Sequence, residues 1–211
     1  MSPGEPPLFG LILAGGRSSR MGLDRPKPLL EIGGKSMVRR VADRLHPFVS
    51  PLLVATDRPD LYGDLGVRTI VDEAPGHAGP LAGLQAGALH ALAGGEPHAR
   101  LVSAPADTPF LPEDFVPRLA DGATPDELRV AAFEDSLHPV CALWPHDALR
   151  HLAALRLDAA AAPSLRSVMR EFRVVVVAFP AAAGAPAGDP FFNVNTPDDL
   201  AVARRTALFG G

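Results

Sequence analysis

The chain has 211 residues, of which 47% are hydrophobic and 21% charged, a balance that fits an ordinary globular domain with a sizeable core. Its formal net charge of −4 argues against a broad nucleic-acid-binding surface, which needs a surplus of Lys and Arg. The sequence has no apolar run near the roughly 20 residues of a membrane helix and no basic signal-peptide segment at its start. The one cysteine, Cys141, permits no intrachain disulfide. We therefore expect a cytoplasmic protein that binds neither nucleic acid nor membrane.

Apolar runs separated by Gly and Pro predict strands that alternate with helices along the chain. Strands are expected over residues 8–13, 52–55, 67–71, 100–104, 130–133, 139–144 and 174–179. Helices are expected over residues 36–45, 81–92, 145–155 and 165–171, and further helices at Pro112 and Thr196. This alternation predicts a three-layer, Rossmann-like α/β fold around a mostly parallel, mixed sheet. Residues 180–190, rich in Ala, Gly and Pro, are expected to form a surface loop.

A glycine-rich loop follows the first predicted strand. Gly15, Gly16 and Gly22 bracket two serines and two arginines, Arg17 and Arg20. Glycine lets the backbone approach a ligand closely, and successive N–H groups can then surround phosphate oxygens. Arginine adds a planar group that binds phosphate through two hydrogen bonds. The loop has neither the Walker A pattern nor the dinucleotide-binding glycine pattern. Its place at the end of a strand favours phosphate binding, and the alternative is a solvated basic turn.

Two aspartates, Asp72 and Asp107, each follow a predicted strand, on the sheet edge where the glycine loop is expected. Magnesium in phosphate-transfer sites takes one or two carboxylates together with phosphate oxygens and water. Asp107 is the better candidate ligand, because an acid that ends a small, apolar strand has no packing role. Asp72 is equally compatible with capping a backbone amide. Lys27 lies between two prolines, and this pattern alone indicates a surface lysine in an extended loop.

Five segments of the chain together resemble one enzyme family. They are residues 13–22 (LAGGRSSRMG), 75–83 (PGHAGPLAG), 107–112 (DTPFLP), 138–144 (HPVCALW) and 192–197 (FNVNTP). The set resembles the molybdenum cofactor guanylyltransferases, which belong to the superfamily of nucleotide-diphospho-sugar transferase-like enzymes. The similarity covers nearly the whole chain and implies a single nucleotidyltransferase domain over residues 1–211.

The resemblance implies a defined reaction, in which GMP passes from GTP to the terminal phosphate of molybdopterin and pyrophosphate is released. It implies magnesium as cofactor, GTP and molybdopterin as substrates, apo-molybdoenzymes or their chaperones as further partners, and a monomer. By position, the resemblance implies nucleotide binding by Leu13, Ala14, Gly15, Lys27, Asp72 and Asp107, metal binding by Asp107, and a place for Asn193 and Asn195 near the acceptor or the metal. From the loop chemistry and the reaction we add nucleotide binding by Gly16, catalysis by Lys27, Asp107 and Arg20, and contact of His138 with the acceptor or pyrophosphate. For His138, a structural role in the strand is the alternative.

The chain departs from the family pattern at two places. The family usually has Asp-Lys directly after Met-Gly, whereas this chain has Asp24-Arg25-Pro26-Lys27. The following leucines align Lys27, and Arg25 is the alternative phosphate-binding cation. Ala55 ends the second strand where the family often has Asn.

Three other functions remain open on the sequence alone: a molybdopterin cytidylyltransferase, a sugar-phosphate nucleotidyltransferase, or a non-catalytic protein that binds nucleotide or cofactor. The opening Leu-Ala-Gly-Gly favours guanylyl over cytidylyl transfer, because the resemblance implies Leu-Ala-Ala-Gly in the cytidylyl relatives. The presence of both Lys27 and Asp107 favours an enzyme over a binding protein.

Overall fold

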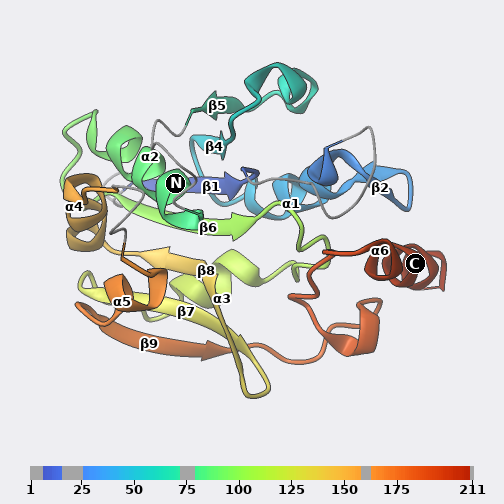
Figure 1. Cartoon of the computed structure of the whole chain (residues 1–211). Helices are drawn as coiled ribbons and strands as arrows, with labels where there is room; N and C mark the ends of the chain where they lie inside the picture. The colour runs from blue at the N-terminus through green and yellow to red at the C-terminus, as the bar shows by residue number, and fades with distance from the viewer. Residues whose placement is uncertain (1–6, 16–25, 72–78, 158–162, 210–211) are drawn as a thin grey trace.

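A seven-stranded mixed sheet forms the centre of the fold in the computed structural model, which describes residues 7–15, 26–71, 79–157 and 163–209 (Figure 1). In spatial order the strands are β5 (Arg68–Ile70), β4 (Leu52–Ala55), β1 (Leu8–Leu13), β6 (Arg100–Pro105), β8 (Ser136–Trp144), β7 (Glu127–Phe133) and β9 (Arg173–Ala178). The pairs β5–β4, β4–β1, β1–β6 and β7–β9 are parallel, and β8 runs antiparallel to both of its neighbours. The prediction of a mostly parallel, mixed sheet is confirmed.

Helices cover both faces of this sheet (Figure 1). One buried cluster joins the sheet to α1 (Met37–Leu45) and α3 (Phe115–Ala120). A second cluster, on the opposite face, joins it to α2 (Pro80–Leu92), α4 (His146–Ala154) and α5 (Leu165–Met169). The structure is therefore the predicted three-layer α/β arrangement. None of the helices in the described ranges is long and apolar enough to cross a membrane.

A third, smaller cluster lies beside the sheet, around a short hairpin of β2 (Glu31–Ile32) and β3 (Lys35–Ser36). The C-terminal helix α6 (Pro197–Phe209) packs against β2. Four 3₁₀ turns complete the elements: η1 (Lys27–Leu29), η2 (Pro59–Leu61), η3 (Gly63–Leu65) and η4 (Pro186–Gly188). Leu30, Phe110 and Val194 belong to this third cluster, so it lies next to the segments that carry Lys27, Asp107 and Asn195.

Helix α2 approaches the sheet closely because two of its positions are glycines. A Cβ at Gly83 would lie 2.4 Å from Leu13 Cδ2, and a Cβ at Gly87 would lie 2.6 Å from Leu11 Cδ2. A larger residue at either position would therefore push α2 away from β1. The contact between Gly83 and Leu13 brings the first turns of α2 beside the end of β1, where the glycine loop begins.

Two predicted helix starts, those of α1 and α6, are confirmed by their capping contacts. Ser36 accepts a hydrogen bond from the Arg39 amide at the start of α1, at 3.4 Å. At the start of α6, Thr196 Oγ1 accepts from the Asp199 amide at 3.1 Å, and Asp199 Oδ2 accepts from the Thr196 amide at 2.8 Å. This reciprocal pair of bonds is a capping box with Asp in the acidic position.

Four elements differ from the sequence prediction. The helix expected at Pro112 begins at Phe115, and the β2–β3 hairpin, which turns at Gly33 and Gly34, was not predicted. The strand expected over 130–133 extends back to Glu127, where it pairs with the start of β9. The expected surface loop 180–190 is partly packed, since Ala185 is buried in the third cluster and the 3₁₀ turn η4 lies within it.

Candidate functional site

Two neighbouring parallel strands bring the site to one edge of the sheet. Leu13 at the end of β1 pairs with Pro105 at the end of β6, and the Ala106 amide continues the ladder by donating to the Leu13 carbonyl at 3.0 Å. Gly15 and Asp107 each lie two residues beyond this last pair, so they leave the sheet side by side. Gly15, where the glycine loop begins, and the candidate metal ligand therefore share an edge, as expected for ligand sites in open α/β sheets.

Lys27 points inward and pairs with Asp107. Its Nζ lies 2.5 Å from Asp107 Oδ2 and 2.7 Å from Asn195 Oδ1. The Lys27 side chain is only 15% exposed and that of Asp107 23%. The surface lysine indicated by the flanking prolines alone is wrong, because residues far away in the sequence supply its oxygen partners. Pro28 instead lies inside η1, the turn that begins at Lys27 itself.

Asn193 and its neighbours surround Asp107 from the other side. With the Asn193 amide oriented to satisfy its surroundings, its nitrogen donates to Asp107 Oδ1 at 2.6 Å. The Val194 amide donates to the Asp107 main-chain carbonyl at 3.1 Å. Asp199 in turn accepts from the Asn195 amide at 2.9 Å, so the start of α6 fixes this segment. Four predicted site residues, Lys27, Asp107, Asn193 and Asn195, thus form one hydrogen-bonded group.

His138 lies on β8, at the base of the same region. Its ring stacks on Phe191, with ring centroids 4.4 Å apart and planes inclined by 30°. Burial lowers the pKa of His138, and the nearby Asp189 opposes this shift. Its Nε2 is buried and has no hydrogen-bond partner in the described part of the chain. Because Phe191 comes two residues before Asn193, His138 contacts the residues that lead into Asn193–Asn195, here called the asparagine segment.

The remaining predicted site residues are placed only in part. Ala14 is buried in the core under α1, Leu13 is half-buried against α2, and Gly15 is exposed. Gly16, Arg20 and Asp72 lie outside the described residues, as does Arg25, the alternative to Lys27. Their expected roles therefore stay predictions.

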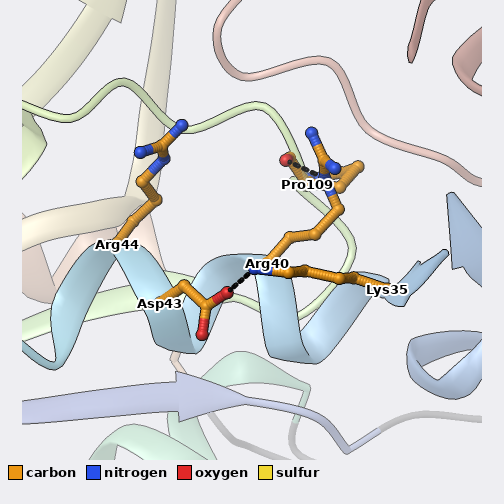
Figure 2. A pocket seen from close by; sticks show the side chains of 5 residues that line it. All are labelled: Lys35, Arg40, Asp43, Arg44 and Pro109. Carbon is orange, nitrogen blue, oxygen red and sulfur yellow. Dashed lines mark hydrogen bonds and ion pairs between the residues drawn. The ribbon is translucent and has the colours of Figure 1, made fainter. Parts of the chain in front are cut away.

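Arg40 on α1 is a residue that sequence reasoning missed. Its Nε donates to the Pro109 carbonyl at 3.0 Å, two residues beyond Asp107, and its guanidinium lies over the Phe110 ring. Figure 2 shows Arg40 reaching from the helix to Pro109, beside a hollow also lined by Lys35, Asp43 and Arg44. The sequence carries no signal for this contact beyond an arginine on an amphipathic helix.

The oxygen atoms around Lys27 suit a hard cation. Asp107 Oδ2 and Asn195 Oδ1 converge on one ammonium at 2.5 and 2.7 Å, so the site already holds a positive charge between two oxygens. The described residues contain no cluster of three or more His, Cys, Asp or Glu that could bind a metal by itself. One carboxylate and amide oxygens, completed by phosphate and water, match the way magnesium is held in nucleotide sites.

The chain is similar to known proteins over nearly its whole length. A molybdenum cofactor guanylyltransferase from Rhodopseudomonas palustris (strain BisB5) is 40% identical over 214 residues, covering 97% of this chain and 96% of that protein. One from Mesorhizobium japonicum is 40% identical over 207 residues, covering 94% and 95%. The crystal structure of molybdopterin-guanine dinucleotide biosynthesis protein A from Archaeoglobus fulgidus superposes with a TM-score of 0.68 at 22% identity, covering 95% of this chain and 99% of that one.

The family profile described as the MobA-like NTP transferase domain matches residues 10–177, most of the chain. That range includes the end of β1, Lys27 and Asp107, while Asn193 and Asn195 follow it. The chain therefore belongs to the family of MobA-like NTP transferase domains.

Proposed function

We propose that this chain is a molybdenum cofactor guanylyltransferase, which transfers GMP from GTP to the terminal phosphate of molybdopterin and releases pyrophosphate. The relatives that are about 40% identical over nearly their full length carry this name. The observation that carries the proposal is the group formed by Lys27, Asp107, Asn193 and Asn195 beside the end of β1. It combines one carboxylate, amide oxygens and an ammonium at the place where a nucleoside triphosphate would lie.

Magnesium is the cofactor that these residues fit. Asp107 would hold it, together with an amide oxygen of the asparagine segment, and the bound ion would neutralise charge on the reacting phosphates. Lys27 would then balance the remaining negative charge of the triphosphate. The glycine loop would contribute backbone amides, and Arg20 a guanidinium, to the same phosphates.

In the proposed reaction the protein has to align the two substrates and neutralise the charge on their phosphates. A phosphate oxygen of the acceptor attacks the α-phosphorus of GTP in line, and the bond from that phosphorus to the bridging oxygen breaks as pyrophosphate leaves. The attacking oxygen is already an anion at neutral pH, so no general base is required. Catalysis then depends on alignment and on stabilising the charge that develops on pyrophosphate. Lys27 is the described cation best placed for this role.

The acceptor is proposed to lie against the asparagine segment, with Asn193 and Asn195 as contacts. His138 reaches this segment through Phe191, so its effect on the acceptor is proposed to be indirect. We further propose that the protein acts as a monomer in the cytoplasm and passes its product to apo-molybdoenzymes or their chaperones.

The test is pyrophosphate release with molybdopterin as acceptor, comparing GTP, CTP and UTP in the presence and absence of magnesium. We expect release with GTP and magnesium, and a loss of at least about a hundredfold in Asp107→Ala, since this variant removes a charge aimed at the transition state. Asp107→Asn keeps the shape of the side chain and is expected to lose activity similarly. Asp43→Ala, which removes a surface carboxylate, is the matched control.

The alternatives predict other outcomes. Turnover with CTP alone would make the protein a cytidylyltransferase, and turnover with sugar phosphates but not molybdopterin would make it a sugar-phosphate enzyme. Binding of nucleotide without pyrophosphate release would indicate a non-catalytic carrier. Full activity in Asp107→Ala would refute the metal assignment.

A further inference from the structure

The loop that carries Asp107 depends on contacts from other segments for its shape. Residues 106–111 contain neither helix nor strand. The loop is bound by Thr108 Oγ1, which donates to the Pro105 carbonyl at 2.9 Å, and by the Val194 amide, which donates to the Asp107 carbonyl. Arg40 on α1 also binds it, through the Pro109 carbonyl. A carboxylate on such a loop holds its position only as well as these contacts do.

Arg40 binds main-chain carbonyls that follow each member of the Lys27–Asp107 pair in the sequence. Its Nε donates to the Pro109 carbonyl at 3.0 Å, and its Nη1 makes a longer bond of 3.5 Å to the Ile32 carbonyl. Ile32 lies in β2, five residues after Lys27, and Pro109 lies two residues after Asp107. One guanidinium on α1 therefore bridges the main chains on either side of the ion pair.

A row of rings continues the contact to the asparagine segment. The Arg40 guanidinium carbon lies 5.6 Å from the centroid of the Phe110 ring, and Phe110 meets Phe192 edge-on at 6.4 Å. Phe192 directly precedes Asn193, which binds Asp107. Phe110 and Val194 also share the third buried cluster. Displacement of Phe110 would consequently reach Asn193 as well as Asp107.

The surroundings of Arg40 are unusual for a surface arginine. Burial lowers its pKa, Arg44 lowers it further, and Asp43 opposes the shift, although an arginine stays charged at neutral pH. Among the described residues Arg40 forms no ion pair and directs its hydrogen bonds to backbone carbonyls. Arg44, one turn along α1, pairs instead with Glu113 at 2.7 Å. The two arginines line the same hollow (Figure 2), but Arg40 binds backbone carbonyls whereas Arg44 binds a carboxylate.

We infer that Arg40 is a positioning residue, which fixes the Asp107 carboxylate relative to Lys27 and Asn193 by bridging the Pro109 and Ile32 carbonyls and covering Phe110. The effect of Arg40 on catalysis rests on the function proposed above. The effect of Arg40 on the position of the loop is independent of that function, because these contacts exist in the protein alone.

The first measurement is amide hydrogen exchange in the ligand-free protein, read at Val194. This amide donates to the Asp107 carbonyl, so it reports whether the loop keeps its place. In Arg40→Ala we expect Val194 to exchange about tenfold faster or more, because the bond is lost when the loop shifts. In Arg44→Ala, which removes a cation from the same helix and hollow, the rate is expected to stay at the wild-type value.

The second measurement is the split between kcat and KM for GTP. A shift of about 1 Å in a catalytic group costs about a hundredfold, so Arg40→Ala is expected to lower kcat by about that factor. KM for GTP should change by less than about threefold, because the glycine loop and Lys27 remain. Arg40→Lys keeps the charge but not the planar fork over Phe110, so we expect it to stay well below wild type. A merely destabilising change would instead lower the active fraction and leave the kcat of the folded protein unchanged.

The outcomes distinguish a failure of the positioning role of Arg40 from a failure of the proposed function. If Val194 exchange and kcat in Arg40→Ala match those of Arg44→Ala, or if Arg40→Lys restores both fully, the positioning role is wrong. If Arg40→Ala does not fold, Arg40→Lys and Phe110→Leu give the same test, because each removes part of the bridge. If the wild type releases no pyrophosphate from GTP, the proposed function fails while the exchange measurement still decides the role of Arg40.

Discussion

Replacing Lys27 with methionine is expected to have two opposite effects: tighter binding of a divalent cation to the ligand-free protein, and slower catalysis. The Lys27 ammonium lies 2.5 Å from Asp107 Oδ2 and 2.7 Å from Asn195 Oδ1, so it occupies the place where these oxygens would hold a metal ion. Methionine keeps a long apolar side chain and removes the charge. A cation entering the variant no longer has to displace the ammonium.

The size of the first effect follows from the exposure of the pair. Its side chains are 15% and 23% exposed, so the pair lies between exposed ion pairs, which contribute about 0–1 kcal/mol, and buried ones. Discounted for solvent screening, the pair contributes about 1 kcal/mol. In the methionine variant the ammonium no longer competes with the metal ion for Asp107, so the Kd of the metal is expected to fall about fivefold. The second effect, on kcat, is expected to be a loss of about a hundredfold or more, because the variant lacks the charge that we propose stabilises the departing pyrophosphate.

Titration of Mn²⁺ into the ligand-free protein, with free Mn²⁺ read by electron paramagnetic resonance, measures the first effect. Lys35→Met is the matched control, because it removes one positive charge and an exposed ion pair with Asp43. Equal Mn²⁺ affinities in the two variants would refute the reasoning, since the ammonium would then not compete for Asp107.

Two further predictions concern packing and pH. Gly83→Ala is expected to lower the free energy of unfolding by about 1–2 kcal/mol, because the new Cβ would lie 2.4 Å from Leu13 Cδ2 and 3.2 Å from Ala55 Cβ. Thermal denaturation should show this loss relative to Gly94→Ala, whose Cβ would meet its nearest neighbour at 3.8 Å; equal stabilities would contradict the packing argument. For His138, burial lowers the pKa below the ordinary 6.5, so the unfolded chain takes up a proton before the folded protein does, and stability falls as the pH drops below 6.5. Urea denaturation at about pH 7.5 and about pH 5.5 should show a smaller acid loss in His138→Phe than in wild type, and the same loss in both would argue against this cause.

The sequence was sufficient to predict the fold class and one side of the site. The alternation of strands and helices follows from local periodicity, and parallel strands necessarily place their carboxyl ends on one edge. For this reason Gly15 and Asp107 could be expected on the same edge. That β1 and β6 are direct neighbours, with Leu13 opposite Pro105, is a property of strand order and became visible only in the structure.

The other side of the site depends on contacts that local sequence does not encode. The prolines beside Lys27 indicate an extended surface loop, whereas Asn195, 168 positions further along, draws the ammonium inward. Only the family resemblance predicted that Lys27 belongs to the nucleotide site. Arg40 gave no signal, because its partners are backbone carbonyls, which any residue can supply. The β2–β3 hairpin was missed because strands of two residues are too short for alternation to be recognised.

The position of Asn193 and Asn195 so late in the chain determines when the site can be completed during synthesis. Lys27 and Asp107 leave the ribosome long before the segment that encloses them, and α6, which fixes that segment through Asp199, comes later still. A nascent chain that has not yet reached Asn193 already contains the residues of all seven strands but lacks the amide groups that bind Asp107. Under the proposed function, productive nucleotide binding therefore has to wait until translation has passed Asn195.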